Sequence, residues 1–278
     1  MKKLFDELSL QVSKAVTEKY STSFSLGILA LSPKIRPAIY SIYGFVRLAD
    51  EIVDSFHDYN KKELLDRFTE QTWLALDEGI SLNPILQSFQ ETVQQYAIDR
   101  QLIRQFLHSM AMDLENIQYN SDLYKEYILG SAEVVGLMCL QVFTGGDKLE
   151  YERLKPYAMK LGSAFQKVNF LRDLKDDYHL LGRSYFPHIN MQHFDNAVKK
   201  QIEQEITEEF REALIGIKKL PSSSKFGVYL AYKYYLSLFR KIKGLPAERI
   251  LYERVRIPNS QKISLAMSSY VQYKTTFL

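Results

Sequence analysis

The stretch PKIRPAIYSIYGFVRLADEIVDSFH, residues 33–57, is predicted to form one long helix. Its apolar side chains recur every three or four residues from Ile35 to Val53, which is the spacing of a buried or amphipathic helix. We expect this helix to begin at Ser32 and Pro33, because serine is a good capping residue and proline fits the first helical position. The rest of the chain is organised around this helix.

Four polar side chains of this segment follow one another at intervals of three or four residues: Tyr43, Arg47, Asp50 and Asp54. At this spacing they lie on one narrow face of a helix. Carboxylates in apolar surroundings are costly unless they are paired or bound to a cation. Two of them one turn apart suit magnesium, which combines one or two carboxylates with phosphate and water. A solvated acidic face explains this helix equally well.

A second acidic segment favours the metal site over the solvated face. The sequence FQKVNFLRDLKDDYHLLG, residues 165–182, belongs to a helix that we expect to start at Lys155-Pro156 and to end near Gly182. Its polar side chains repeat the pattern of the first helix: Asn169, Asp173 and Asp177 on one face, with Gln166 and Arg172 beside them. If the two helices face each other across a cavity, they form a cage for divalent cations and a diphosphate.

Seven segments, in order along nearly the whole chain, resemble the squalene/phytoene synthase family, and bacterial phytoene synthases most. They are YSTSFS (20–25), YGFVRLADEIVD (43–54), MAMDL (110–114), GSAEVVGLM (130–138), NFLRDLKDD (169–177), RSYFP (183–187) and ERVRIPNSQK (253–262). The resemblance implies an all-α fold, an isoprenoid-synthase-type helical bundle around a central apolar cavity, with residues 1–278 as a single domain.

The resemblance also implies an enzyme, a prenyltransferase that joins two geranylgeranyl diphosphates head to head to form phytoene in carotenoid biosynthesis. In this family the product forms through a cyclopropyl intermediate, with release of diphosphate. The main alternative is a squalene or dehydrosqualene synthase that uses farnesyl diphosphate. A head-to-tail prenyltransferase, a terpene cyclase and a catalytically inactive binding or assembly factor are further alternatives. The closeness of RSYFP and ERVRIPNSQK to phytoene synthases favours the twenty-carbon substrate.

When the family's motifs are matched to this sequence residue by residue, the resemblance also implies which residues form the active site. The catalytic residues are Arg47, Asp50, Asp54, Arg172, Asp173 and Asp177, and the metal ligands are Asp50, Asp54, Asn169, Asp173 and Asp177. The substrate-binding residues are Tyr20, Ser21, Ser23, Tyr43, Asp113, Tyr127, Gln166, Tyr235 and Arg254. Magnesium is the expected cofactor, with manganese as an alternative, and NADPH is not expected. Leu129 departs from the family, since many relatives have a tyrosine there, and the role of that tyrosine is either lost here or taken by Tyr127.

Composition agrees with a globular protein that has a small-molecule substrate. The chain of 278 residues is 46% hydrophobic and has a net charge of +3, which does not indicate a nucleic-acid partner. Its single cysteine, Cys139, excludes an internal disulfide and fits a reducing compartment. No apolar run approaches the ~20 residues that a spanning helix needs. We therefore expect a cytoplasmic protein with peripheral contact at the inner face of the membrane and no obligate protein partner.

The remaining pattern predicts about ten to twelve helices in all. Asn83-Pro84 is expected to open one helix that runs to about Asn116. The apolar segment 123–143 is expected in the centre of the fold, and the charged segment 194–220 on its surface.

Overall fold

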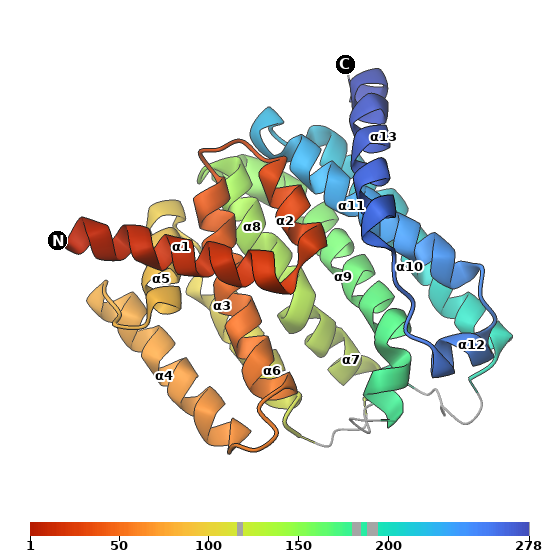
Figure 1. Ribbon diagram of the computed structural model, residues 1–278, viewed down its shortest axis with the longest axis horizontal. Helices are drawn as coiled ribbons and strands as arrows, with labels where there is room; N and C mark the ends of the chain where they lie inside the picture. Colours follow the sequence, from red (N-terminus) through yellow and green to blue (C-terminus); the bar gives the residue numbers. More distant parts are fainter. Residues whose placement is uncertain (116–118, 180–184, 188–193, 278) are drawn as a thin grey trace.

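The computed structural model describes residues 1–115, 119–179, 185–187 and 194–277, and for residues 177–179, 259, 263 and 276–277 it describes the backbone alone. These parts of the chain form thirteen α-helices and one π-helical segment and contain no strand, which confirms the predicted all-α fold (Figure 1). The elements are α1 (Lys2–Tyr20), α2 (Thr22–Leu29), α3 (Arg36–Asp54), α4 (Lys61–Glu78), α5 (Pro84–Tyr96), α6 (Arg100–Met112), α7 (Ser121–Ile128), η1 (Leu129–Glu133), α8 (Val134–Thr144), α9 (Lys148–His179), α10 (Asn196–Lys219), α11 (Ser222–Lys243), α12 (Ala247–Tyr252) and α13 (Asn259–Phe277).

The single helix predicted from Asn83 to about Asn116 is wrong, and Asn116 itself lies outside the described residues. The chain breaks at Ala97, whose φ of 51° is in the left-handed region that ends helices. Helix α6 then starts anew, because the Asp99 side chain accepts a hydrogen bond from the backbone N–H of Gln101 at 2.8 Å. The count therefore exceeds the ten to twelve helices predicted.

Two predicted helix starts are also wrong. Helix α3 begins at Arg36, since Ser32 lies in a turn where its carbonyl accepts from the N–H of Ile35 at 3.1 Å. Helix α9 begins at Lys148, eight residues before Pro156, which lies inside it. The Asp147 side chain caps this helix by accepting from two backbone N–H groups at 2.9 and 3.1 Å. The predicted end at Gly182 lies outside the described residues.

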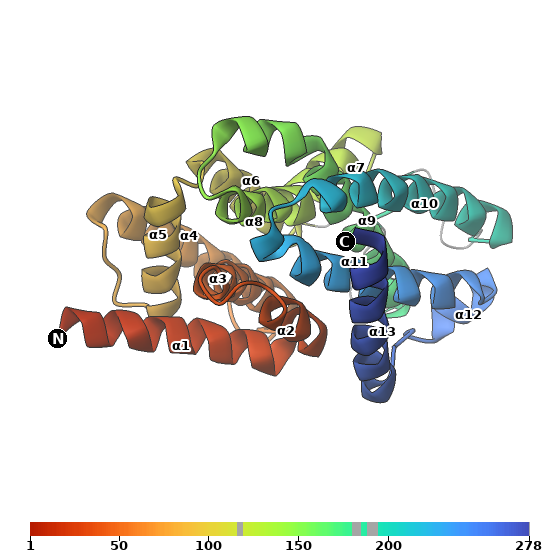
Figure 2. The same ribbon diagram turned by 90° about the horizontal axis from the view of Figure 1, so that it is seen from above.

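The two helices that carry the acidic segments belong to different halves of the bundle. Helix α3 packs against α1, α5 and α8, whereas α9 packs against α8, α10 and α11. Seen from above, α1 and the neighbouring α3 lie on one side of the molecule and α10 lies on the opposite side (Figure 2). The core is correspondingly divided into two clusters of buried apolar side chains, one centred on α3 to α6 and α8 and the other on α7 and α9 to α12.

Helices α7 and α8 form one continuous rod through the short π-helical turn η1. Within the described residues, this stretch, Ser121–Thr144, is the one helix long and apolar enough to cross a membrane, although we expected none. It packs against α3, α6 and α9, and its buried side chains include Val134 and Met138. Such contacts are those of a core helix, which confirms the predicted central position.

Candidate active site

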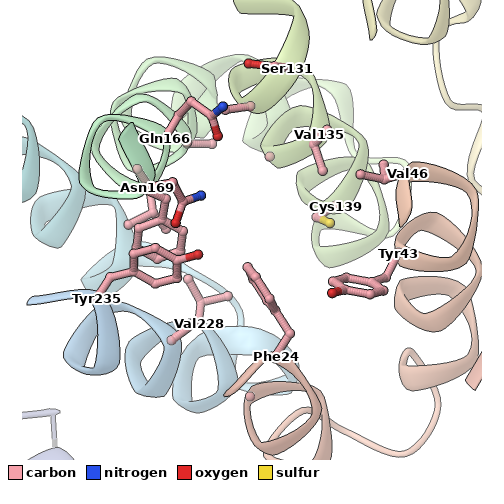
Figure 3. A pocket seen from close by; sticks show the side chains of 18 of the residues that line it. Phe24, Tyr43, Val46, Ser131, Val135, Cys139, Gln166, Asn169, Val228 and Tyr235 are labelled. Carbon is pink, nitrogen blue, oxygen red and sulfur yellow. The ribbon is translucent and has the colours of Figure 1, made fainter. Parts of the chain in front are cut away.

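A cavity of about 510 Å³ lies between the two halves of the bundle. Side chains from α2, α3, η1, α8, α9 and α11 surround it, as the labelled residues in Figure 3 show. Most of its wall is apolar, and the charged side chains gather at one end, where α3 and α9 present their acidic segments. Twelve of the residues predicted for the site lie in the wall: Tyr43, Arg47, Asp50, Asp54, Asp113, Tyr127, Gln166, Asn169, Arg172, Asp173, Tyr235 and Arg254.

On α3, the first acidic segment contains Asp50, whose negative charge is only weakly balanced by neighbouring cations. Burial, and next the charge of Asp54, raise the pKa of Asp50 to about 7. The nearest cation, Arg47, is 3.9 Å from the Asp50 carboxylate, and its short hydrogen bond goes to Glu51 instead. A cation or a proton is therefore needed to balance Asp50 at neutral pH.

On α9, the second acidic segment is already neutralised by arginines. Arg172 Nε donates to Asp173 Oδ1 at 2.9 Å, and Arg254 Nε lies 2.8 Å from the same oxygen. Arg254 also approaches Asp176 at 3.7 Å. Because Arg254 follows α12, the C-terminal part of the chain contributes positive charge to the same end of the cavity. The side chain of Asp177 lies outside the described residues.

A third carboxylate, Asp113 at the end of α6, is held by two tyrosines. Tyr127 donates to Asp113 Oδ2 at 2.8 Å, and Tyr185 donates to Oδ1 at 3.1 Å. The Asp113 charge also acts on Asp50, which places the end of α6 near the acidic segment of α3. Sequence reasoning did not identify Tyr185, although the segment RSYFP contains it. The hydroxyl of Tyr127, two residues before Leu129, is thus committed to Asp113.

Aromatic rings line the cavity next to the charged end. The Tyr235 ring stacks on Phe165 at 3.8 Å between centroids, and Phe24 lies 5.5 Å from Tyr43. Burial raises the pKa of Tyr43 to about 12, so its hydroxyl keeps its proton. Cys139 faces the cavity from α8, and burial raises the pKa of its thiol to about 12, as expected for an inert cysteine.

Three predicted substrate-binding residues do not line the cavity. Ser21 caps α2 by accepting a hydrogen bond from the backbone N–H of Phe24 at 3.2 Å. Tyr20 is half exposed and lies beneath the Arg47 guanidinium, 4.4 Å from its ring centroid. Ser23 is partly buried in the first turn of α2. These residues support Arg47 and the start of α2, next to the charged end.

The donors present fit a hard divalent cation. Within the described parts of the chain, no three His, Cys, Asp or Glu side chains lie close enough together to hold a metal ion. However, the buried amide oxygen of Asn169 has no hydrogen-bond partner, and Asp50 lacks a close counter-charge. Oxygen atoms of this kind are the ligands that magnesium prefers, with water and phosphate in its other positions. The arrangement can therefore bind an anionic, metal-chelating group.

A buried charge network lies behind the cavity, between α9 and α10. Lys167 Nζ is 2.7 Å from Glu209 Oε1, and the Ser163 hydroxyl donates to the same oxygen at 2.8 Å. All three residues are buried, so the prediction that segment 194–220 is an exposed helix is wrong for this face. Burial, and next the charge of Glu209, raise the pKa of the nearby Glu133 to about 7. This network was not identified from the sequence.

Comparison with known proteins identifies the family. The family described as squalene/phytoene synthase matches residues 17–261. Phytoene synthase 1 from Solanum lycopersicum is 31% identical over 250 residues, covering 82% of this chain and 58% of that protein. Phytoene synthase 2 from the same plant is 30% identical, covering 82% of this chain and 77% of the relative. The chain thus spans about three fifths of the length of the first of these relatives.

Solved structures show the same fold. A dehydrosqualene synthase in complex with a ligand superposes with a TM-score of 0.82 at 20% identity, covering 97% of this chain and 98% of that one. Squalene synthase HpnC from Alicyclobacillus acidocaldarius gives a TM-score of 0.73 at 19% identity, with 85% and 93% covered. The family match covers most of the chain, and the relatives and the fold agree with it. The chain belongs to the squalene/phytoene synthase family.

Proposed function

We propose that this chain condenses two molecules of geranylgeranyl diphosphate head to head, forming phytoene and releasing diphosphate. The observation that carries this proposal is a cavity whose wall includes residues of both acidic segments and is otherwise mostly apolar. Such a cavity suits a substrate with a charged head and a long hydrocarbon tail. The phytoene synthases of Solanum lycopersicum, at about 30% identity, support the twenty-carbon substrate.

The arginines provide the binding site for the diphosphate. Arg172 and Arg254 already lie at the charged end of the cavity, where their guanidinium groups can donate charge-assisted hydrogen bonds to phosphate oxygens. Arg47, with a buried Nε that has no hydrogen-bond partner, can add another. Positive charge fixed at this point stabilises the charge that develops on the leaving group as the allylic carbon–oxygen bond breaks.

Magnesium is proposed as the cofactor, held by Asp50, Asp54, Asn169, Asp173 and Asp177. When bound, it would supply Lewis-acid assistance to the departure of diphosphate. The unpartnered oxygen of Asn169 and the weakly compensated charge of Asp50 support this assignment. NADPH is not part of the proposal, because phytoene formation needs no reductant.

The apolar wall protects the cationic intermediates of the proposed reaction. Rings of Phe165, Tyr235 and Phe24 lie near the charged end, where their faces can stabilise an allylic cation by about 1–2 kcal/mol. The double bond of the second substrate would attack this cation, and the dry wall excludes the water that would otherwise quench it. The hydrocarbon product would be apolar, which supports the expected peripheral contact with a membrane.

To test this proposal, the purified protein is incubated with magnesium and either farnesyl or geranylgeranyl diphosphate, with and without NADPH. The mass of the product is then measured by mass spectrometry. We expect a forty-carbon hydrocarbon from geranylgeranyl diphosphate without NADPH. A thirty-carbon product alone would instead support the second candidate, a squalene or dehydrosqualene synthase, which the fold of the dehydrosqualene synthase structure favours. The absence of both product and diphosphate release would support an inactive binding factor.

A further inference from the structure

We propose that Tyr157, which packs against Gly216, narrows the cavity near its far end and limits the length of the prenyl chain that fits. This inference rests on the proposed function, because it assumes that the apolar cavity holds prenyl chains. Tyr157 lies on α9, the helix that carries Asp173, and both side chains line the same cavity. A single helix thus carries both the acidic segment at the charged end and the aromatic ring that narrows the cavity.

The spacing along α9 gives the distance from the charged end of the cavity to Tyr157. Tyr157 precedes Asp173 by 16 residues, which corresponds to ~24 Å along the helix axis. An isoprene unit adds four main-chain carbon–carbon bonds of about 1.5 Å, or about 5 Å when extended. A twenty-carbon chain of four units therefore spans roughly 20 Å and, with its link to the diphosphate, reaches from Asp173 to Tyr157. A fifteen-carbon chain ends about one unit short of Tyr157.

The backbone of α10 holds Tyr157 firmly in place. A Cβ atom at Gly216 would lie 2.2 Å from the Tyr157 Cβ, so only glycine lets α10 approach α9 this closely. The two helices lie side by side in Figure 1. Because backbone cannot give way as a flexible side chain does, the ring of Tyr157 cannot move back into α10 when a longer chain enters.

The other side of the Tyr157 ring faces solvent. The ammonium of Lys219, an exposed residue at the end of α10, lies 4.8 Å from the ring centroid and 3.4 Å from the hydroxyl. Tyr157 is therefore part of the wall between the apolar cavity and water. Leu154, a buried aliphatic residue, lines the same cavity one turn farther along α9. Removing the Tyr157 ring would thus let a chain about one isoprene unit longer reach the wall near Leu154.

The experiment measures binding and turnover separately. Thermal stabilisation of the magnesium-free protein is measured with prenyl diphosphates of fifteen, twenty and twenty-five carbons, and product formation is then measured with magnesium. For the wild type, we expect apparent affinity to rise from fifteen to twenty carbons and to fall at twenty-five. Tyr157→Ala should raise the affinity for the twenty-five-carbon ligand relative to the twenty-carbon ligand by about tenfold or more. Tyr157→Trp should shift the preference toward the fifteen-carbon ligand.

Tyr151→Ala is the matched control, because Tyr151 is a partly buried tyrosine of α9 that lies outside the cavity wall. This substitution should leave the dependence of affinity on prenyl chain length, the length profile, unchanged. If Tyr157→Ala does not fold, the Tyr157→Trp profile decides the question alone. Unchanged profiles in the Tyr157 variants, or an equal shift in Tyr151→Ala, would overturn the inference even if phytoene forms. A Tyr157-dependent binding profile without any product would instead overturn the proposed function and leave the inference standing.

Discussion

Replacing Asp50 by asparagine is expected to stabilise the metal-free protein at neutral and alkaline pH. Burial and the charge of Asp54 raise the pKa of Asp50 from 3.8 to about 7. The folded protein therefore keeps this proton to a higher pH than the unfolded chain does, and the free energy of unfolding falls as the pH rises from about 4 to about 7. Asparagine has no charge to desolvate, so this loss should disappear.

The size of the effect follows from the pKa and from solvent exposure. A shift of about three pKa units corresponds to about 4 kcal/mol for a fully buried group. However, the Asp50 side chain is 35% exposed, and solvent screening reduces such a figure strongly. We expect a gain of about 1–2 kcal/mol at pH 8, which raises the melting temperature of a chain of this size by a few degrees.

The assay is thermal unfolding followed by circular dichroism at pH 5 and pH 8, in chelator and in magnesium. Glu51→Gln is the matched control on the same helix. Burial raises the pKa of Glu51, but its hydrogen bond and charge interaction with Arg47 outweigh burial and lower the pKa overall. This control should therefore destabilise the protein at pH 8. The reasoning is refuted if Asp50→Asn is no more stable than the wild type at pH 8, or if its gain is as large at pH 5.

Three further substitutions test the surroundings of the cavity. Lys167→Met leaves the buried Glu209 carboxylate with only the partly exposed Lys160, 4.0 Å away, as a cation, and should cost about 3–5 kcal/mol in urea unfolding, most of which the double variant with Glu209→Met should restore. A double variant as unstable as the single one would contradict this. Tyr127→Phe removes the 2.8 Å hydrogen bond to Asp113 and should cost about 1–3 kcal/mol in the same assay, and an unchanged midpoint would be evidence against that bond. Arg254→Gln should change stability by less than about 1 kcal/mol, because this ion pair is exposed, but should raise the KM for the prenyl diphosphate about tenfold. An unchanged KM would remove Arg254 from the proposed diphosphate site.

The sequence was sufficient for the features that depend on local spacing. Residues four apart in a helix share a face whatever the rest of the fold does, so Asp50 and Asp54 were correctly placed on one side of α3. The same rule placed Asn169 and Asp173 together on α9. The family resemblance then supplied the fold, including the meeting of these two helices at one cavity, which spacing alone does not provide.

The predictions are wrong or incomplete where the local sequence signal is weak, or where tertiary contacts determine the structure. Ala97 ends α5 in a left-handed conformation without the glycine that normally marks such a position. Pro156 is typical of a helix start, but α9 begins earlier, directly after the capping residue Asp147. Tyr185 and Asp113 are far apart in the sequence, so only the folded chain shows their hydrogen bond. Charged residues normally lie on surfaces, so the buried pair Lys167 and Glu209 could not be read from composition.

Diphosphate release in a double-mutant cycle tests most directly whether the two acidic segments act together. The wild type, Asp50→Asn, Asp173→Asn and the double variant are assayed with geranylgeranyl diphosphate and magnesium, after circular dichroism has shown that each is folded. If both segments hold the same diphosphate, each single substitution should abolish nearly all release and the double one should cost little more. Near-normal release in either single variant, or losses that simply multiply in the double variant, would contradict a shared site.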